Sequence, residues 1–410
     1  MEPNTSTISN SHISEQSINN TPDEIWTPDV IVLGPGGAKG YLELGLLLAF
    51  EQQNYYLNTS IWRGCSIGSA IALLIVCGYS VIDIINDCID VNIINDVTDI
   101  NIDHITESPG LLSIKSVENL IKLRVSQRFG IVPSLKQLFM ATGILLELVT
   151  FNLDKYRPEY LSKNTEPNLS CVEAVMMSMA IPALVRPRIY HGHVYIDGAI
   201  GDPYPILDHD DGTKKILGVY IDSEHSSHSS DKNIARYLYR CAQASMKVLR
   251  DRAIEGASDN CKHIALKTPV LDTTGLTLDH DTKRSMIEYG YKTGSIFLNR
   301  IKNPDKYRLL LDDDEEIQIE EEIMATNDQG ILDDETAQML NMLSGDDYHT
   351  DNHLFRDSGS DEDLFLSDLV ELDEEIDEDT LLIPITPEIR RNMEQLYRDN
   401  RSSLSQRNNN

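Results

Sequence analysis

The first regular hydrophobic pattern of the chain is a short apolar run that ends at a glycine. Residues Val30–Leu33 are all apolar, three of them are β-branched, and Gly34 follows directly. A helical pattern then continues through Leu42, Leu44, Leu46 and Leu48. A β-branched run that is closed by glycine is typical of a buried strand. This part of the sequence therefore predicts a strand, a glycine turn and a helix.

A second unit of the same kind follows at residues 60–77. Residues 60–63 predict a strand, a tight turn covers Gly64 to Ser66, and a helical pattern continues to Cys77. Further strands are expected at residues 148–151, 194–196 and 216–221, and helices at 233–252 and 281–303. Successive strand–turn–helix units imply a parallel sheet, so we expect an α/β protein of three layers, with helices flanking a mainly parallel central sheet.

The segment between these units, residues 111–148, has helical periodicity throughout. Ser113 is a plausible N-terminal cap for it. Its recurring apolar positions are Leu120, Leu123, Leu135, Leu138 and Leu145. We therefore expect helices up to the strand that begins at residue 148.

The two ends of the chain differ in composition from the part between them. Residues 1–27 are rich in Ser, Asn and Thr with few apolar residues, which predicts a disordered leader. Residues 309–380 form an acidic low-complexity tail, and residues 381–410 are expected to hold one short helix at 387–398. One folded domain is therefore expected at residues 28–308.

The formal net charge of −31 comes mostly from the acidic tail. Between Asp312 and Asp379 the chain has 27 Asp and Glu residues and one basic residue, Arg356, so the remainder of the chain sums to only −5. An acidic chain repels phosphate backbones, so nucleic-acid binding is not expected. We expect the tail to keep the protein in solution or to bind a protein partner, with autoinhibition as the alternative.

The sequence also bears on location. No Lys or Arg precedes Lys39, so the start lacks the charged and apolar regions of a cleaved secretory signal. The longest apolar stretch, residues 67–77, is about half the roughly 20 residues that a spanning helix needs. The six cysteines include no C-x-x-C pair and are expected to be reduced thiols. We therefore expect a cytoplasmic protein with peripheral membrane contact and neither disulfides nor metal.

The turn at Gly64-Cys65-Ser66-Ile67-Gly68 satisfies the nucleophile-elbow pattern G-x-S-x-G. Small residues two before and two after the serine let a strand turn sharply into a helix, which pushes the serine side chain outward. A predicted strand precedes Ser66 and a predicted helix follows it. Ser66 is therefore the candidate nucleophile, and a plain helix cap is the alternative.

The first glycine turn, Gly34-Pro35-Gly36-Gly37-Ala38-Lys39-Gly40, lies where a strand enters a helix. Glycines there let several backbone N–H groups point at one small anion, which suits a tetrahedral oxyanion. The turn lacks the ending of a phosphate-binding loop and the glycine spacing of a dinucleotide fingerprint. An oxyanion hole is thus predicted at Gly36, Gly37, Ala38, Lys39 and Gly40, with a structural glycine turn as the alternative.

A candidate base follows the strand predicted at residues 194–196. Asp197-Gly198-Ala199 puts a carboxylate at a strand end, where glycine permits a close turn. There Asp197 could accept the proton of Ser66. An isolated Asp-Gly pair is usually only a turn, so this assignment depends on the other two motifs.

Taken in this order, the three motifs resemble those of the patatin-like phospholipase family. The segment Met177-Ser178-Met179-Ala180-Ile181-Pro182 is similar to that family's Ser-x-Ala-x-Pro segment. The resemblance covers residues 29–205, and it departs mildly from the family pattern at Pro35, Lys39 and Ala199. It implies a patatin-like fold and a Ser-Asp dyad in place of a triad. It also implies hydrolysis of phospholipid, lysophospholipid or neutral glycerolipid esters without a cofactor.

Three further hypotheses follow from the sequence. His191 and His193 share strand parity with Asp197, so a histidine could serve Ser66 in a triad. Basic residues recur in a predicted amphipathic helical region and could touch an anionic lipid surface, although an ordinary solvated face is the favoured explanation: Lys115, Lys122, Arg124 and Arg128. The domain could also be a non-catalytic lipid-binding scaffold, against which the intact motifs argue.

Overall fold

The computed structural model describes residues 25–89, 114–182, 184–223, 234–268 and 278–303. The acidic tail, the segment expected to hold the last short helix and most of the predicted leader lie outside these ranges, as does Ser113. Residues 25–27 of that leader are described, and Trp26 packs against the hydrophobic core.

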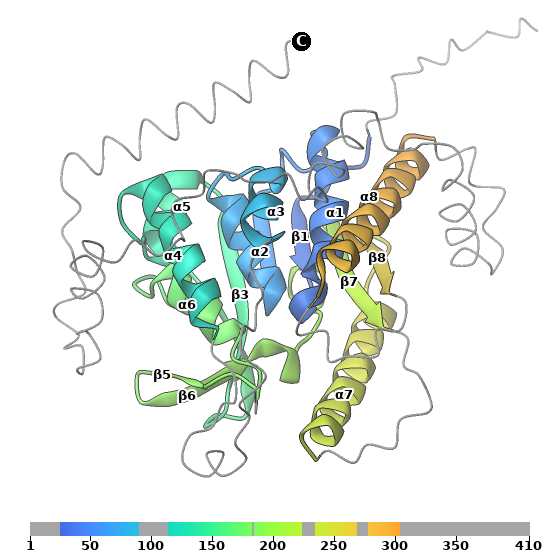
Figure 1. Cartoon of the computed structure of the whole chain (residues 1–410). Helices are drawn as coiled ribbons and strands as arrows, with labels where there is room; N and C mark the ends of the chain where they lie inside the picture. Colours follow the sequence, from blue (N-terminus) through green and yellow to red (C-terminus); the bar gives the residue numbers. More distant parts are fainter. Residues whose placement is uncertain (1–24, 90–113, 183, 224–233, 269–277, 304–410) are drawn as a thin grey trace, which may run out of the picture.

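The centre of the domain is an eight-stranded sheet in the order β5-β6-β3-β2-β1-β7-β8, with β4 beside β3 (Figure 1). Strands β3, β2, β1, β7 and β8 are parallel to their neighbours in this series, whereas β4, β6 and β5 join by antiparallel pairs. The strands are β1 Val30–Leu33, β2 Ile61–Cys65, β3 Leu145–Asn152, β4 Arg157–Ser162, β5 Arg188–Tyr190, β6 His193–Asp197, β7 Ile216–Ser223 and β8 Cys261–Thr268. The expected mainly parallel sheet is confirmed.

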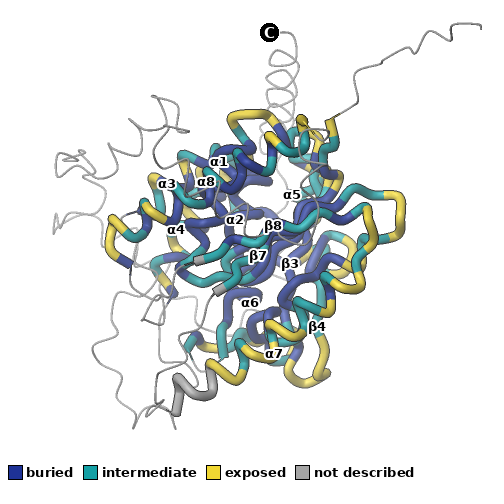
Figure 2. Tube along the Cα trace, turned by 90° about the vertical axis from the view of Figure 1, so that its right-hand side faces the viewer, coloured by how far each residue is buried: buried dark blue, intermediate teal, exposed yellow. Residues whose placement is uncertain are grey.

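Helices cover both faces of this sheet. They are α1 Gly40–Gln52, α2 Ile67–Val76, α3 Val81–Ile89, α4 Lys115–Phe129, α5 Leu135–Thr142, α6 Cys171–Ser178, α7 Ile234–Gly256 and α8 His280–Lys302, with single 3-10 turns at Gly37–Lys39, Gly198–Ile200 and Leu207–His209. On β1, Ile31 and Leu33 join the large core with α1, α2 and α6, while Val30 and Val32 join a second core with Ala253 of α7. Alternation along one strand thus separates the two outer layers, and the strands form the buried centre in Figure 2.

One expected boundary was wrong. Leu145 was expected on a helix, but α5 ends at Thr142 and Leu145 is the first residue of β3. Gly143 caps α5 in the left-handed conformation with φ of 74°, which stops the helix and turns the chain. Leu145 then pairs with Ile61 of β2, so a tertiary partner decides the conformation of an apolar run that suits either structure.

Helices α1 and α8 approach each other backbone to backbone. A Cβ atom built on Gly290 of α8 would lie 2.0 Å from the Leu42 carbonyl oxygen, and one on Gly45 of α1 would lie 2.0 Å from the Ile287 carbonyl oxygen. Helix α8 therefore packs closely against α1, which begins at the glycine turn. Only glycine, whose side chain is a single hydrogen atom, permits these contacts.

We predict that Gly290→Ala lowers the free energy of unfolding by about 1–3 kcal/mol, because the added methyl group overpacks the contact between the two helices. This loss outweighs the gain of about 1 kcal/mol expected from the better helix propensity of alanine. Urea denaturation measures it. The control is Gly256→Ala, where a Cβ atom would come no closer than 3.6 Å to the Leu207 side chain. Equal stability of the two variants would contradict the close approach.

Candidate active site at the carboxyl ends of two strands

Strands β2 and β6 meet end to end along one edge of β3. Strand β4 pairs with β3 from Glu147 to Asn152, so it occupies the other edge of that stretch. Strand β2 pairs with β3 up to Val149, and β6 pairs with it from Thr150 onward in the opposite direction. The carboxyl ends of β2 and β6 therefore face each other where Val149 joins Thr150, and Ser66 and Asp197 stand at those two ends.

Ser66 is the residue at which β2 turns into α2. Its φ of 54° and ψ of −125° form a strained conformation that a serine rarely adopts, and the side chain is buried, with 3% exposed. A Cβ atom on Gly64 would lie 2.4 Å from the Ser69 Cα, and one on Gly68 would lie 2.6 Å from the Leu33 carbonyl oxygen. Both glycines of the predicted elbow are therefore required by close backbone contacts.

Asp197 lies at the end of β6 with 3% of its surface exposed. Burial raises the pKa of its carboxyl to about 6, against the opposing effect of hydrogen bonds from the Ser66 side chain and the Ala199 backbone. The Ala199 N–H donates to Oδ1 at 2.9 Å, which fixes the carboxylate. The two side chains that the sequence singled out are thus hydrogen-bonded partners, although they are far apart along the chain.

The last residue of α6 and the segment after it connect the two strand ends. The Ser66 N–H donates to Ser178 Oγ at 3.0 Å, and the Asp197 N–H donates to the Ala180 carbonyl at 2.8 Å. Thr150 Oγ1 donates to the Ile196 carbonyl at 2.9 Å. The Ser178-Met179-Ala180 stretch was noted only for its resemblance, and its bridging role could not be derived from spacing, because both bonds involve backbone groups of distant residues.

The glycine turn packs directly against the elbow. A Cβ atom on Gly40 would lie 2.7 Å from Ile67 Cγ1, and one on Gly36 would lie 3.6 Å from Ile67 Cγ2, so the turn borders the residue after Ser66. Gly37 has a φ of 57°, in the left-handed region that favours glycine. Within the described part of the chain, the N–H groups of Gly36 and Gly37 donate no hydrogen bond.

Ala38 and Lys39, which follow Gly37 in the turn, are less accessible to a ligand. Ala38 is buried with 7% exposed, and Lys39 is half-buried. Burial lowers the pKa of the Lys39 ammonium group. The Lys39 N–H donates to the Gly36 carbonyl at 3.1 Å, so this amide is occupied within the turn. The Gly40 N–H likewise donates to the Gly37 carbonyl. Of the five predicted residues, Gly36, Gly37 and Ala38 therefore have backbone N–H groups that donate no hydrogen bond within the described part of the chain.

Glu43 is a buried acid that sequence reasoning did not single out. It lies one turn after Gly40 on α1, it is fully buried, and its carboxyl oxygens have no hydrogen-bond partner among the described residues. Burial raises the pKa of Glu43 well above its ordinary value, and its charge would also raise the pKa of Cys65. A glutamate on an otherwise leucine-rich helix was the available signal in the sequence.

A buried ion network holds the segment after Asp197 against β2 and β3. Arg63 of β2 contacts Glu147 of β3 at 2.8 Å and Asp208 at 3.0 Å, and His209 Nε2 lies 2.5 Å from Glu147 Oε2. Burial acts to raise the pKa of Glu147, but the hydrogen bond with His209 and the charge of Arg63 outweigh it and lower the pKa. Breaking such a buried pair typically costs about 3–5 kcal/mol, so the network anchors residues 198–209.

The two histidines of the triad hypothesis lie at a hairpin tip. His191 and Gly192 connect β5 to β6 with positive φ values of 48° and 73°, and His193 Nδ1 lies 3.5 Å from Asp154. His193 precedes Asp197 by four residues along β6, about 13 Å in an extended strand. The structure brings the carboxylate, but neither imidazole, to Ser66.

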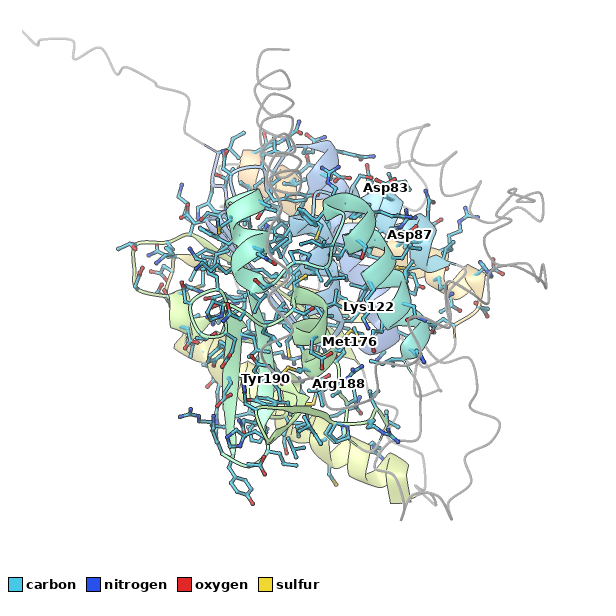
Figure 3. All side chains as sticks on the ribbon, turned by 90° about the vertical axis from the view of Figure 1, so that its left-hand side faces the viewer. Asp83, Asp87, Lys122, Met176, Arg188 and Tyr190 are labelled. Carbon is cyan, nitrogen blue, oxygen red and sulfur yellow. The ribbon has the colours of Figure 1, made fainter. Side chains whose placement is uncertain are left out.

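The basic residues of α4 are mainly engaged within the protein. Lys122 pairs with Glu118 at 2.7 Å, Arg124 pairs with Asp87 of α3, and Arg128 Nε donates to the Cys77 carbonyl at 3.1 Å. Figure 3 shows Asp87 and Lys122 together on this side of the molecule. These contacts favour the structural explanation of the basic residues over lipid binding.

The fold and the site together define an α/β protein in which an elbow serine faces an aspartate across a strand junction. Residues 31–209 match the family model described as patatin-like phospholipase. Residues 31–209 therefore form a patatin-like phospholipase domain, and the expected resemblance is confirmed.

Two viral proteins are similar to this chain. The "Uncharacterized protein R571" of Acanthamoeba polyphaga mimivirus is 27% identical over 206 residues, which are 49% of this chain and 68% of that protein. The "Probable lipid hydrolase 463L" of Invertebrate iridescent virus 6 is 28% identical over 181 residues, which are 43% of this chain and 61% of that protein. The matches thus span about two thirds of these relatives, and about half of this chain lies outside them.

Among solved structures, VipD from Legionella pneumophila has a similar arrangement, with a TM-score of 0.41 and 18% sequence identity over 67% of each chain. That degree of similarity carries no functional argument. Within the described ranges, no helix is both long and apolar enough to cross a bilayer.

We predict that Asp197→Asn stabilises the protein above pH 6. The pKa of Asp197 is raised from 3.8 to about 6 on folding, so the stability that comes from its tightly held proton is complete below pH 4 and is lost as the pH rises through 6. An asparagine stays neutral, so the variant should gain up to about 3 kcal/mol at pH 8 and about half of that at pH 5.

Urea denaturation of both proteins at the two pH values measures this difference. The control is Asp211→Asn, because a hydrogen bond with Lys214 lowers the pKa of that exposed carboxyl and its stability effect should have the opposite sign. A stability gain for Asp197→Asn that does not change with pH would contradict the raised pKa.

Proposed function

We propose that this chain is a lipid acyl ester hydrolase of the phospholipase A or lysophospholipase type, which acts through Ser66 and Asp197. The observation that supports this most directly is the junction of β2 and β6, where a strained, buried serine is hydrogen-bonded to a carboxyl whose pKa is about 6. The family of the domain and a viral relative that is named a probable lipid hydrolase support the choice of lipid esters.

The proposed reaction proceeds in two acyl-transfer steps. Asp197 accepts the proton of the Ser66 hydroxyl while Ser66 Oγ forms a bond to the ester carbonyl carbon. The carbonyl oxygen becomes an oxyanion and accepts hydrogen bonds from the Gly36 and Gly37 N–H groups, each worth roughly 100- to 1,000-fold in rate at comparable sites. When the intermediate collapses, the ester bond breaks, and the leaving alcohol takes the proton from Asp197.

The second step regenerates the enzyme by the same route. A water molecule gives a proton to Asp197 and attacks the acyl-enzyme carbonyl, and the fatty acid leaves as Ser66 recovers its proton. A carboxyl with a pKa near 6 suits both directions of transfer, because at neutral pH it is mostly ionised and still basic enough to take a proton. Peripheral contact with a membrane or micelle supplies the substrate in this scheme, and a cytoplasmic location stays a prediction from the sequence.

The decisive experiment is labelling with a fluorophosphonate probe, followed by an assay of fatty acid release across a panel of lipids. Wild type should be labelled and should release fatty acid, whereas Ser66→Ala should lose the label and more than about 10⁴-fold of the activity. The control is Ser126→Ala on α4, which makes the same chemical change away from the site. An unlabelled wild-type protein would favour the non-catalytic scaffold.

We also predict that the rate falls on the acidic side of pH 6. Protonation of Asp197 removes the base, so kcat/KM for a soluble ester should be half-maximal near pH 6 and should reach a plateau above pH 7. A histidine base would give a similar curve, so the same profile is measured for the double variant His191→Ala/His193→Ala. The Ser-Asp dyad predicts an unchanged profile, and loss of activity in the folded double variant would favour a triad.

A further inference from the structure

The strands that bring Asp197 to Ser66 continue beyond them as a projecting tip. Thr150 of β3 lies opposite Asp197 of β6, and from that level β3 runs on to Asn152 and its turn, while β6 comes from His193. The hairpin turn therefore lies about 13 Å or more beyond the level of Ser66, on the side of the strand carboxyl ends. Figure 1 shows the β5–β6 hairpin at the same end of the molecule as the end of β3.

We call this feature the sheet tip and define it as residues 153–157 of the β3–β4 turn together with residues 188–193 of the β5–β6 hairpin. The two parts are joined: the Leu153 N–H donates to the Val194 carbonyl at 2.8 Å, and the Val194 N–H donates to Asp154 Oδ2 at 2.7 Å. Ile189 pairs with Val194 on its other side. The tip is therefore one surface built from two turns.

The sheet tip holds the two most exposed large apolar side chains of the described structure. Tyr156 is 82% exposed and Ile189 is 76% exposed, and Leu153 adds 41%. Large apolar residues that gather at one projecting point mark an interaction surface more often than scattered single ones do. Tyr156 and Ile189 are exposed enough to insert into an acyl layer.

The backbone presents these side chains in a fixed way. His191 and Gly192 have φ values of 48° and 73°, the pattern of a tight two-residue hairpin turn. Tyr156 has a φ of 52°, which glycine or asparagine adopts far more readily than an aromatic residue does. Neither the backbone conformation at this position nor packing within the protein explains why an exposed tyrosine stands there.

Charge at the sheet tip differs in sign from that of the chain as a whole. Lys155 and Arg157 are exposed there, and Arg186 is exposed just before β5, whereas the exposed acid is Asp154. Glu159 pairs with Lys155 at 3.1 Å and with Arg157 at 3.3 Å, but its side chain is only 17% exposed. A chain with a net charge of −31 therefore presents a locally basic surface around its exposed apolar residues.

We propose that the sheet tip docks this protein on an anionic lipid bilayer. Apolar side chains that project between basic ones match the acyl and headgroup layers of such a surface. With the tip inserted, the carboxyl edge of the sheet faces the bilayer, and a lipid ester reaches Ser66 from there. The purpose of docking rests on the proposed hydrolase function, but the binding itself does not require Ser66.

A second copy of this chain is the competing partner for the sheet tip. Strand β5 is an edge of the sheet, yet it has only three residues and offers few backbone groups to a partner strand. Its basic and apolar neighbours also suit an anionic surface better than a copy of themselves, because like charges would meet across the contact. The lipid surface is therefore the occupant that the tip fits.

The test uses the full chain with vesicles of phosphatidylcholine, made with and without phosphatidylserine. We expect wild type to float with the phosphatidylserine vesicles, and the double variant Tyr156→Ser/Ile189→Ser to bind them at least about tenfold more weakly, because two apolar anchors are lost. The variant should hydrolyse a soluble short-chain ester at the wild-type rate and vesicle lipid much more slowly. The matched control is Met140→Ser/Val248→Ser, which removes exposed apolar residues elsewhere and should bind normally.

Ser66→Ala separates docking from hydrolysis, since it should bind vesicles like wild type and cleave neither substrate. If wild type binds vesicles but hydrolyses neither substrate, the proposed function is wrong and the docking proposal stands. If wild type hydrolyses the soluble ester but does not bind vesicles, the docking proposal is wrong and the proposed function stands. Normal vesicle binding by the tip variant overturns the proposal, and so does binding that is indifferent to phosphatidylserine. A dimer in solution that the tip variant abolishes would assign the surface to a second copy.

Discussion

The junction of β2 and β6 on one edge of β3 is the constraint on which the candidate site depends. Both strands end there at their carboxyl termini, so the elbow of Ser66 and the carboxylate of Asp197 meet without any direct connection between them. Backbone hydrogen bonds to β3 hold each strand, and Ser178 and Ala180 tie the two ends to one further segment. The separation of the two side chains is therefore as well defined as the register of the sheet.

The site concentrates polar groups that a core normally excludes. Asp197 and Glu43 are buried acids, and Glu43 has no partner among the described residues, while Arg63 and Glu147 form a buried pair nearby. Each costs stability when it leaves water, and the apolar layers on both faces of the sheet offset that cost. A pKa near 6 at Asp197 is the direct result of this burial. Burial of Asp197 therefore both lowers the stability of the protein and makes this carboxylate a stronger base.

The same strands link the site to the outside of the molecule. Strands β3 and β6 pass the level of Ser66 and end in two turns that are exposed, apolar and basic, so the register that sets the site also sets the height of the sheet tip above it. The close contact between α1 and α8 fixes the position of α1, which begins at the glycine turn. The glycine turn, the elbow and the tip therefore share one rigid frame.

Local sequence alone determined the elements whose signals are local. The apolar run of β1, the glycines around Ser66 and the Asp-Gly pair after β6 each restrict the backbone directly, and the three motifs together predicted the family and the residues of the site. Tertiary structure decided the rest, because the deciding groups come from distant parts of the chain. Leu145 joined a strand because β2 offered a partner, and β4, which contains Pro158, formed on an open edge of β3. Arg63 with Glu147, the bridge through Ser178 and the exposure of Tyr156 arise only once the sheet has assembled.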